Sequence, residues 1–433
     1  MMEIFYIITE ILFIITILSL PIFLIEKKYY LKSLDINFID KLSISLIFFI
    51  NILFFSSVFN ITLNLIFYIY LFFLLILLLV NYRNISLPKI KANYFFLILL
   101  LFVFFISIDL GDQIYFGWDA KRNWVFKTLN FYQGQRIENL SIFNNSDYPH
   151  LGAFLWSFFW KFPHNNYEYL GRIFYVFFYV LAIISFSNCL KTETFEKLIF
   201  SILLISLTYN YELFSGLQDI LIFSTILLFA RVSFLMFDKK SKPHNLILIF
   251  ILFGIINMLC WFKNEGVFYS IFLVFSLLIT CKFSKKEKLY LILGTFIIFS
   301  LRIFLFNYYS IELNPNYFEM EKTTFLIFSS FLFKLKTITF YLIIYLTQNP
   351  TYIITFPLLG YLVYKYPYNN ITKFILYFLV LNIIFIYLTY MYKMVEVELL
   401  LKASLSRVIF QTSGFYFLII AICLNNYKSG FRK

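Results

Sequence analysis

The sequence predicts an all-α protein that crosses a membrane many times, and three observations support this fold class. Of its 433 residues, 61% are hydrophobic and only 14% are charged. The mean hydropathy is +0.83. Soluble globular domains are about half apolar and about a quarter charged, so the composition excludes that class. The apolar residues also form runs of about 17 to 25 residues, the length at which a helix can cross the hydrocarbon core.

About thirteen runs along the chain are long enough to be spanning helices. They cover residues 5–26, 42–60, 62–80, 94–110, 169–190, 196–214, 217–237, 245–262, 266–281, 289–307, 350–366, 372–393 and 408–424. The first run is followed by Lys27 and Lys28 without a small-residue cleavage site. We therefore expect it to remain as an anchor rather than to be removed as a signal peptide.

The positions of Lys and Arg predict the orientation. If the amino terminus lies outside, the basic loops lie in the cytoplasm, as the positive-inside rule requires. These loops contain Lys27, Lys28, Lys32, Arg83, Lys89, Lys91, Lys239, Lys240, Lys242, Lys282, Lys285, Lys286 and Lys288. The net charge of +13 is then a result of topology, and we expect no nucleic-acid partner.

One apolar run, residues 325–346, does not fit this count because Lys334 and Lys336 lie near its middle. A helix in the headgroup region can extend both lysines toward water, whereas a spanning helix would have to bury them. We therefore expect an interfacial helix or a shallow hairpin on the outer face. The chain shows no short repeat and no linker. We divide it into amino-terminal transmembrane helices, 1–93, and a membrane module, 94–433.

Charged residues are concentrated in a loop at residues 109–150, the first large loop on the outer side. A carboxylate costs about 2.5 to 3.5 kcal/mol at the bilayer centre, so these residues lie outside the hydrocarbon. The loop contains Asp109, Asp112, Asp119, Lys121, Arg122, Lys127, Asp147 and His150. We expect interfacial helices here and contact with a polar ligand.

Further polar clusters fall on the same predicted face. They contain Asp219, then Lys263 with Glu265, and finally Arg407. Solvated turns carry charge without any function, so each cluster alone also fits a plain loop. Lys263 lies where the positive-inside rule disfavours lysine, and Asp219 begins an apolar run, so both are functional candidates. The four cysteines lack metal-ligand spacing and are expected to be packing residues.

Five segments, in this order, resemble bacterial members of the GT-C glycosyltransferase superfamily, which includes protein mannosyltransferases and the lipid A aminoarabinose transferase. The segments are GWDAKRNWVFKTL (117–129), DYPHLGAFLW (147–156), FSGLQDILI (214–222), WFKNEGVF (261–268) and SRVIFQ (406–411). The resemblance implies transfer of a sugar from a polyprenyl-phosphate donor to a glycan, lipid or protein acceptor. It places this activity at the outer face of a bacterial inner membrane.

The resemblance gives Asp119 the role of catalytic base or metal ligand, because a carboxylate of the first outer loop has this role in the family. Transfer also needs cations that hold the leaving phosphate, and the candidates are Lys121, Arg122, Lys263 and Arg407. Other candidate substrate-binding residues are Lys127, Tyr148, His150, Asp219 and Glu265. Asp112 and Asp119, with Asp109, provide the oxygen ligands that Mg or Mn prefers.

Two other functions remain open on the sequence. A transporter or flippase for lipid-linked sugars also needs many spans, but it needs ionisable or broken helices near the midplane. An O-antigen ligase or polymerase uses the same donors, but its large outer loop lies late in the chain. Here the large loop lies early in the chain, and the candidate polar clusters are all predicted on the outer face. These features favour the transferase.

Overall fold

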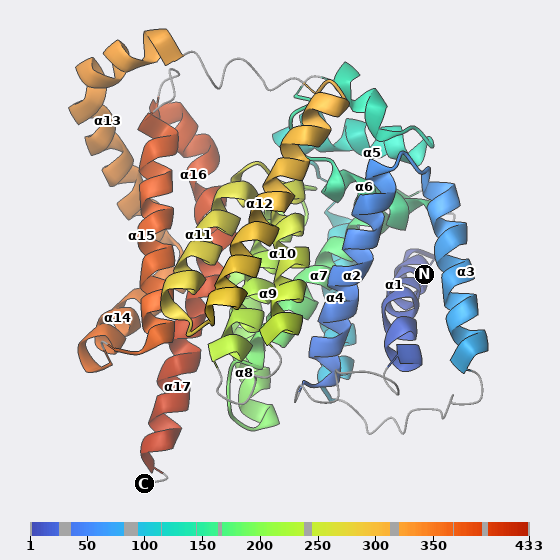
Figure 1. The fold of residues 1–433 in the computed structure, drawn as a ribbon, viewed down its shortest axis with the longest axis horizontal. Helices are drawn as coiled ribbons and strands as arrows, with labels where there is room; N and C mark the ends of the chain where they lie inside the picture. The colour runs from blue at the N-terminus through green and yellow to red at the C-terminus, as the bar shows by residue number, and fades with distance from the viewer. Residues whose placement is uncertain are drawn as a thin grey trace.

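The computed structural model describes residues 2–25, 36–81, 94–113, 115–143, 145–162, 167–237, 245–311, 320–366, 368–391 and 397–431. Within these ranges every regular element is a helix. Most of the long helices run side by side between two ends of a bundle (Figure 1). We call the end that carries residues 115–161 the loop end. The all-α membrane fold is therefore confirmed at this level.

Within the described ranges, ten helices are long and apolar enough to cross a membrane. Nine of them are α1 (Met2–Ile25), α2 (Phe38–Val58), α3 (Leu63–Asn81), α4 (Tyr94–Asp112), α7 (Tyr169–Ser187), α9 (Asp219–Phe237), α10 (Asn245–Phe262), α12 (Lys285–Tyr308) and α15 (Asn370–Met391). The tenth joins α16 (Val397–Ser413) to α17 (Leu418–Phe431) through a 3-10 turn, Gly414–Phe417.

Three of the expected spans are shorter helices. They are α8 (Thr194–Thr208), α11 (Glu265–Thr280) and α14 (Pro350–Lys365), with 15, 16 and 16 residues. At 1.5 Å per residue each is at most about 24 Å long, less than the roughly 30 Å hydrocarbon core. For α8 the apolar run continues past the helix end at Thr208 into the following turn, whereas the runs 266–281 and 350–366 match α11 and α14 to within one residue at each end.

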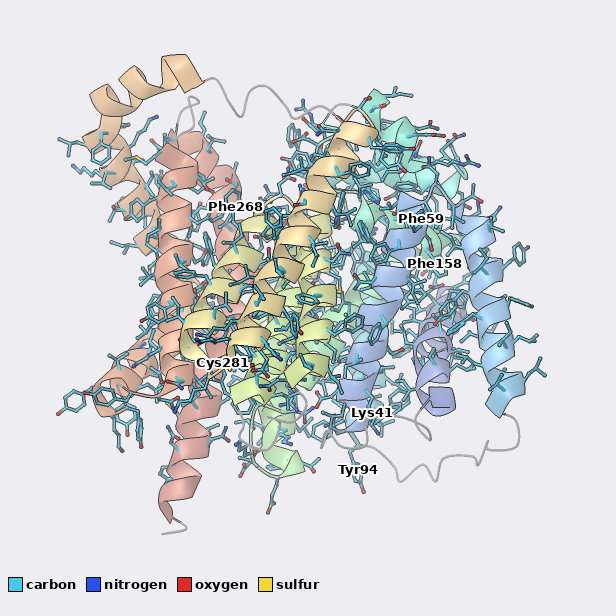
Figure 2. The ribbon with its side chains drawn as sticks, in the orientation of Figure 1. Lys41, Phe59, Tyr94, Phe158, Phe268 and Cys281 are labelled. Carbon is cyan, nitrogen blue, oxygen red and sulfur yellow. The ribbon has the colours of Figure 1, made fainter. Side chains whose placement is uncertain are left out.

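The centre of the bundle is α7, in which every residue from Tyr169 to Ser187 is buried. It packs against α4, α6 (Leu151–Lys161), α8 and α9. In contrast, α3 and α12 keep most of their apolar side chains on the outside, as lipid-facing helices do. Figure 2 shows Phe59 at the loop end and Lys41 and Tyr94 at the opposite end, which gives the directions of α2 and α4.

The loop end is built from short helices that follow α4. These are the π-helical turn Ala120–Trp124, α5 (Val125–Tyr132), the 3-10 turn Ile137–Ile142 and α6. The helix α6 is not amphipathic, since all residues from Leu151 to Trp160 are buried. It packs between α5 and α7 and so fixes the loop to the central helix.

The segment 325–346 forms neither a hairpin nor a helix that stays at one end. It belongs to one helix, α13 (Met320–Gln348), which packs along α15 and α16. The end of α13 lies at the depth of the middle of α15. Tyr352, just beyond α13, has its hydroxyl 3.0 Å from Thr412 Oγ1. The same Thr412 oxygen accepts a hydrogen bond from Asn382, in the middle of α15. The ammonium of Lys334 donates to the carbonyl of Met391 at the loop end of α15. That Lys334 and Lys336 extend toward water stays a prediction.

A second difference concerns the segment before the last expected span. Residues 397–407 form the first three turns of α16 instead of a loop, so Arg407 lies inside a helix. Glu398 and Lys402 are both exposed on α16 and form an (i, i+4) ion pair at 2.8 Å. Arg407 points elsewhere, into the polar network described below.

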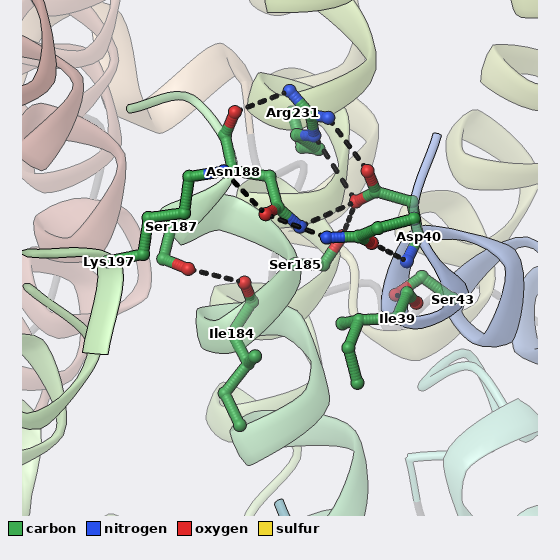
Figure 3. Close-up of polar contacts among 10 residues, drawn as sticks. Ile39, Asp40, Ser43, Ile184, Ser185, Ser187, Asn188, Lys197 and Arg231 are labelled. Atoms are coloured by element: carbon green, nitrogen blue, oxygen red, sulfur yellow. Dashed lines mark hydrogen bonds and ion pairs between the residues drawn. The ribbon is translucent and has the colours of Figure 1, made fainter. Parts of the chain in front are cut away.

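Charge is also buried at the end opposite the loop. Asp40 of α2 accepts hydrogen bonds from Arg231 Nη2 of α9 at 2.7 Å and from Ser185 Oγ of α7 at 2.8 Å (Figure 3). Asn188 and Arg231 Nε also donate to this carboxylate, at 3.3 and 3.2 Å. The expectation that the significant charges share one face is therefore wrong. It failed because Asp40 and Arg231 lie about 190 residues apart and neither belongs to a visible cluster.

Close packing of α6 on α7 gives the first testable prediction. A Cβ atom at Gly171 would lie 2.4 Å from the backbone carbonyl oxygen of Trp156, which cannot move without distorting α6. We expect Gly171→Ala to lower the free energy of unfolding by about 1 to 3 kcal/mol, measured as the thermal midpoint in detergent. Gly360→Ala is the matched control, since a Cβ there meets nothing within 4 Å. Equal midpoints for the two variants would contradict this packing.

Candidate functional site

A buried ion pair lies at the loop end of the central helices. Asp219 is the first residue of α9, and its side chain has no exposed surface. Lys263 directly follows α10, and its ammonium lies 3.0 Å from Asp219 Oδ1 and 3.3 Å from Glu265 Oε1. Two carboxylates therefore face one buried ammonium. They raise the pKa of Lys263 although its burial alone would lower it.

The helix α16 supplies two more side chains to this cluster. Gln411 donates from its amide to Asp219 Oδ1, and Arg407 donates to Asp119 Oδ2 of the large loop. Residues four apart lie on the same helix face, so one face of α16 contacts both the ion pair and the loop. We call Asp119, Glu212, Asp219, Lys263, Glu265, Arg407 and Gln411 the polar network.

Glu212 is the least expected member of the polar network. It lies in a 3-10 turn, Tyr211–Leu213, between α8 and α9, and only 3% of its surface is exposed. Burial and the negative charge of Asp219 raise the pKa of Glu212 to about 8, although Arg407 and Lys263 oppose this shift. The network therefore contains a carboxyl group that holds its proton near neutral pH beside a carboxylate that is paired.

Several atoms of the polar network have no hydrogen-bond partner among the described residues. They are the oxygens Asp219 Oδ2, Glu212 Oε2, Glu265 Oε2 and Gln411 Oε1, and the nitrogen Arg407 Nε. A buried polar atom without a partner costs about 1 to 3 kcal/mol, so such atoms are rare unless a ligand or water completes them. The Asp40 carboxylate at the opposite end has its partners in place. The buried charges at the two ends of the bundle therefore differ in how fully their hydrogen bonds are satisfied.

Arg172 of α7 holds the loops that carry the polar network. Its guanidinium binds Glu168 through two bonds of 2.9 and 3.1 Å and also donates to the carbonyl of Phe214. The Gly117 amide donates to Ser215 O at 2.8 Å, which ties the loop of Asp119 to the segment before α9. The chain can turn there because Gly216 has a φ of 70°, which L side chains rarely adopt.

Two predicted substrate-binding residues of the large loop lie in its interior instead. Lys127 is fully buried, and its ammonium donates to the carbonyls of Asn145, Ser146 and Tyr148. Burial lowers its pKa to about 7. His150 Nε2 lies 2.8 Å from the Ser57 hydroxyl in a buried contact. The Lys127 side chain holds the loop together, the His150 side chain joins the loop to α2, and neither contacts the polar network.

The remaining predicted cations of the loop lie over aromatic rings of the loop itself. Lys121 lies 5.6 Å from the ring centroid of Tyr115, and Arg122 lies 5.0 Å from that of Trp118. Both cations are exposed. The ring of Tyr148 packs edge-on against Trp124, with a centroid distance of 5.5 Å. These residues cover the loop surface, where cation–π contacts are weak.

The proposed metal ligands do not lie together. Asp112 is exposed at the end of α4, and Asp109 accepts hydrogen bonds from Tyr209 and Gln113. Asp119 is paired with Arg407. Among the described residues there is no group of three or more His, Cys, Asp or Glu side chains that could hold a metal ion. Binding of Mg or Mn by Asp112 and Asp119 stays a prediction.

The sequence interpretation included Asp119, Asp219, Lys263, Glu265 and Arg407, which the structure brings together. It missed Glu212 and Gln411. A signal for Gln411 existed, because it follows Arg407 by one helical turn. Glu212 gave no signal, since a single acid in a turn is usually solvated.

The raised pKa of Glu212 gives a pH-dependent prediction. Its folded-state pKa of about 8 exceeds the ordinary 4.5, so the native protein holds more protons than the unfolded chain between these values. Its contribution to stability is present at low pH and is lost as pH rises through about 8. We expect Glu212→Gln to flatten the fall of the thermal midpoint between about pH 5 and 9. The exposed control Glu398→Gln should keep the wild-type slope, and unchanged slopes in both variants would contradict the assignment.

Comparison with protein families, with curated proteins and with solved structures gives no match for this chain.

Proposed function

We propose that the protein is a membrane glycosyltransferase of GT-C type. It transfers a sugar from a polyprenyl-phosphate donor to a glycan, lipid or protein acceptor, and its loop end faces the periplasm or exterior of a bacterial inner membrane. The observation that carries the proposal is the contact between Asp119 and Arg407 beside the buried Asp219–Lys263 pair. It joins the large loop to a helix long enough to span a membrane, at the end where the proposal puts the donor phosphate.

The reaction needs a base and a phosphate-binding cation. A hydroxyl oxygen of the acceptor attacks the anomeric carbon while the bond to the donor phosphate breaks, and the hydroxyl proton passes to a carboxylate. Asp119 is the proposed base, and about a quarter of its side chain is exposed. Arg407 is the proposed phosphate ligand, because guanidinium binds phosphate and carboxylate through the same geometry.

This assignment gives the Asp119–Arg407 pair a role in the order of events. While Arg407 binds Asp119, its guanidinium engages Oδ2 of the carboxylate that is proposed to receive the hydroxyl proton. A donor phosphate competes with Asp119 for the guanidinium, whose Nε has no partner within the described part of the chain. Binding of the donor therefore releases Asp119 next to the anomeric carbon.

The proposed role of Lys263 differs from the sequence expectation. Its ammonium is already engaged by Asp219 and Glu265, so it has less capacity than Arg407 for a phosphate. We assign it the positioning of these two carboxylates. Their free oxygens, Asp219 Oδ2 and Glu265 Oε2, are then available as acceptors for sugar hydroxyl groups.

A transporter of lipid-linked sugars is the second candidate, and one observation favours it. The helix α9 carries Asp219 at one end and Arg231 about 18 Å further along, and each belongs to a buried polar cluster. Charges buried at two depths of one helix are typical of transport pathways. An assay that measures both sugar transfer and lipid translocation separates the two functions.

The test uses purified protein in nanodiscs with a labelled polyprenyl-phosphate sugar and a cell-envelope acceptor extract. We expect wild-type protein to release polyprenyl phosphate, and Asp119→Asn to lower the rate by about 10² to 10⁴-fold, the usual contribution of a general base. Asp119→Asn should also bind the donor at least as tightly as wild type, because Arg407 is then free. Glu398→Gln, which lies on the same helix as Arg407, should keep full activity.

Two outcomes would overturn this assignment. If Asp119→Asn retains activity within about threefold of wild type, Asp119 is not the base. If wild-type protein moves the lipid between leaflets and leaves the phosphate bond intact, the protein is a transporter.

A further inference from the structure

A groove separate from the polar network lies between α4 and α8. Its volume is about 550 Å³, which is within the usual range of about 300 to 1,000 Å³ for ligand sites. Its walls are apolar and include Phe102, Phe105 and Ile106 from α4 and Ile205 from α8. Phe105 is 63% exposed on a helix that is apolar enough to span, so the groove opens toward lipid.

The loop end of this groove is polar and acidic. Asp109, Asp112 and Tyr209 line it, and the Tyr209 hydroxyl donates to Asp109 Oδ2. Neither aspartate forms an ion pair among the described residues, so their charge is not neutralised there. An apolar trough with an acidic end fits an amphiphile whose head donates hydrogen bonds, and it repels a phosphate head.

The acidic end lies close to the polar network along the chain. Tyr209 lines the groove, and Glu212, three residues later, belongs to the network. Three residues span at most about 11 Å. The Asn210 side chain accepts a hydrogen bond from the Glu212 amide at 3.0 Å, which fixes the short connection. A head group held at Asp109 and Asp112 is thus near the proposed site of transfer.

We infer that the α4–α8 groove binds a membrane lipid whose uncharged or cationic head carries hydroxyl or amine groups, and that this lipid is the acceptor. Binding of the lipid does not depend on the proposed function, whereas its role as acceptor rests on it. The donor phosphate is directed to Arg407, and the acidic groove keeps the donor out. The two substrates are therefore separated by charge.

The test uses full-length protein in phosphatidylcholine nanodiscs and two photoreactive probes with identical acyl chains. One probe is a diacylglycerol with a single neutral sugar as its head, and the other is phosphatidic acid. After irradiation, mass spectrometry maps the labelled peptides. We expect the neutral glycolipid to label residues 102–112 and 205–209 more strongly than phosphatidic acid does.

Two variants test the two parts of the groove. Asp109→Asn/Asp112→Asn should lower labelling by the glycolipid about tenfold, the loss expected for a hydrogen bond to a charged group. Ser206→Trp should lower labelling by filling the trough while both carboxylates remain. Glu398→Gln is the control, because it removes an exposed carboxylate away from the groove. The glycolipid should label the groove of this variant as strongly as that of wild type.

Each result decides the inference. Equal labelling by both probes, unchanged in the double variant, would overturn it, because ordinary annular lipid fills the groove in that case. Stronger labelling by phosphatidic acid would also overturn it. If the glycolipid labels the groove but receives no sugar from a polyprenyl-phosphate donor, the binding site stands and only the acceptor role fails.

Discussion

The buried pair of Asp219 and Lys263 is the interaction on which the arrangement of the loop end depends. Two charges cannot remain at a membrane edge without water unless each has a partner. The pair joins the start of α9 to the end of α10, and Gln411 adds α16 to the same carboxylate. Arg407, one turn earlier on α16, then holds the large loop through Asp119. Four distant segments are thus fixed by one chain of polar contacts.

The two ends of α9 use charge differently. At the end opposite the loop, Asp40 receives hydrogen bonds from α7 and α9 and is bound by Arg231 through two nitrogens. A network that is satisfied in this way makes a structure rigid. At the loop end, four side-chain oxygens, one of them on the carboxyl group of Glu212, and one donor nitrogen have no partner among the described residues. Buried polar atoms of this kind are usually completed by a ligand or by water.

The sequence predicted the helical class and most spans because long apolar runs depend only on local composition. It placed Asp219 and Lys263 among the candidates because a charge beside an apolar run is conspicuous, and the family resemblance added Asp119. It could not distinguish these residues from Lys127 and His150, since burial inside a folded loop follows from tertiary contacts. The Asp40–Arg231 pair was missed for the same reason. Arg407 was expected in a loop because charged residues within 397–407 masked the start of α16.

In the proposed function the Asp219 end of α9 serves a ligand, whereas the Asp40 end serves the fold. The most direct test compares Asp40→Asn with Asp219→Asn for thermal midpoint and for sugar transfer in nanodiscs. We expect Asp40→Asn to destabilise the protein strongly, by about 3 to 5 kcal/mol, because Arg231 loses its only carboxylate partner among the described residues. Asp219→Asn should lower the midpoint less than Asp40→Asn does, since the Asn amide oxygen can still accept from Lys263 and Gln411 and Lys263 retains Glu265, and it should abolish transfer. A large loss of stability in Asp219→Asn, with normal transfer by the protein that remains folded, would contradict the account.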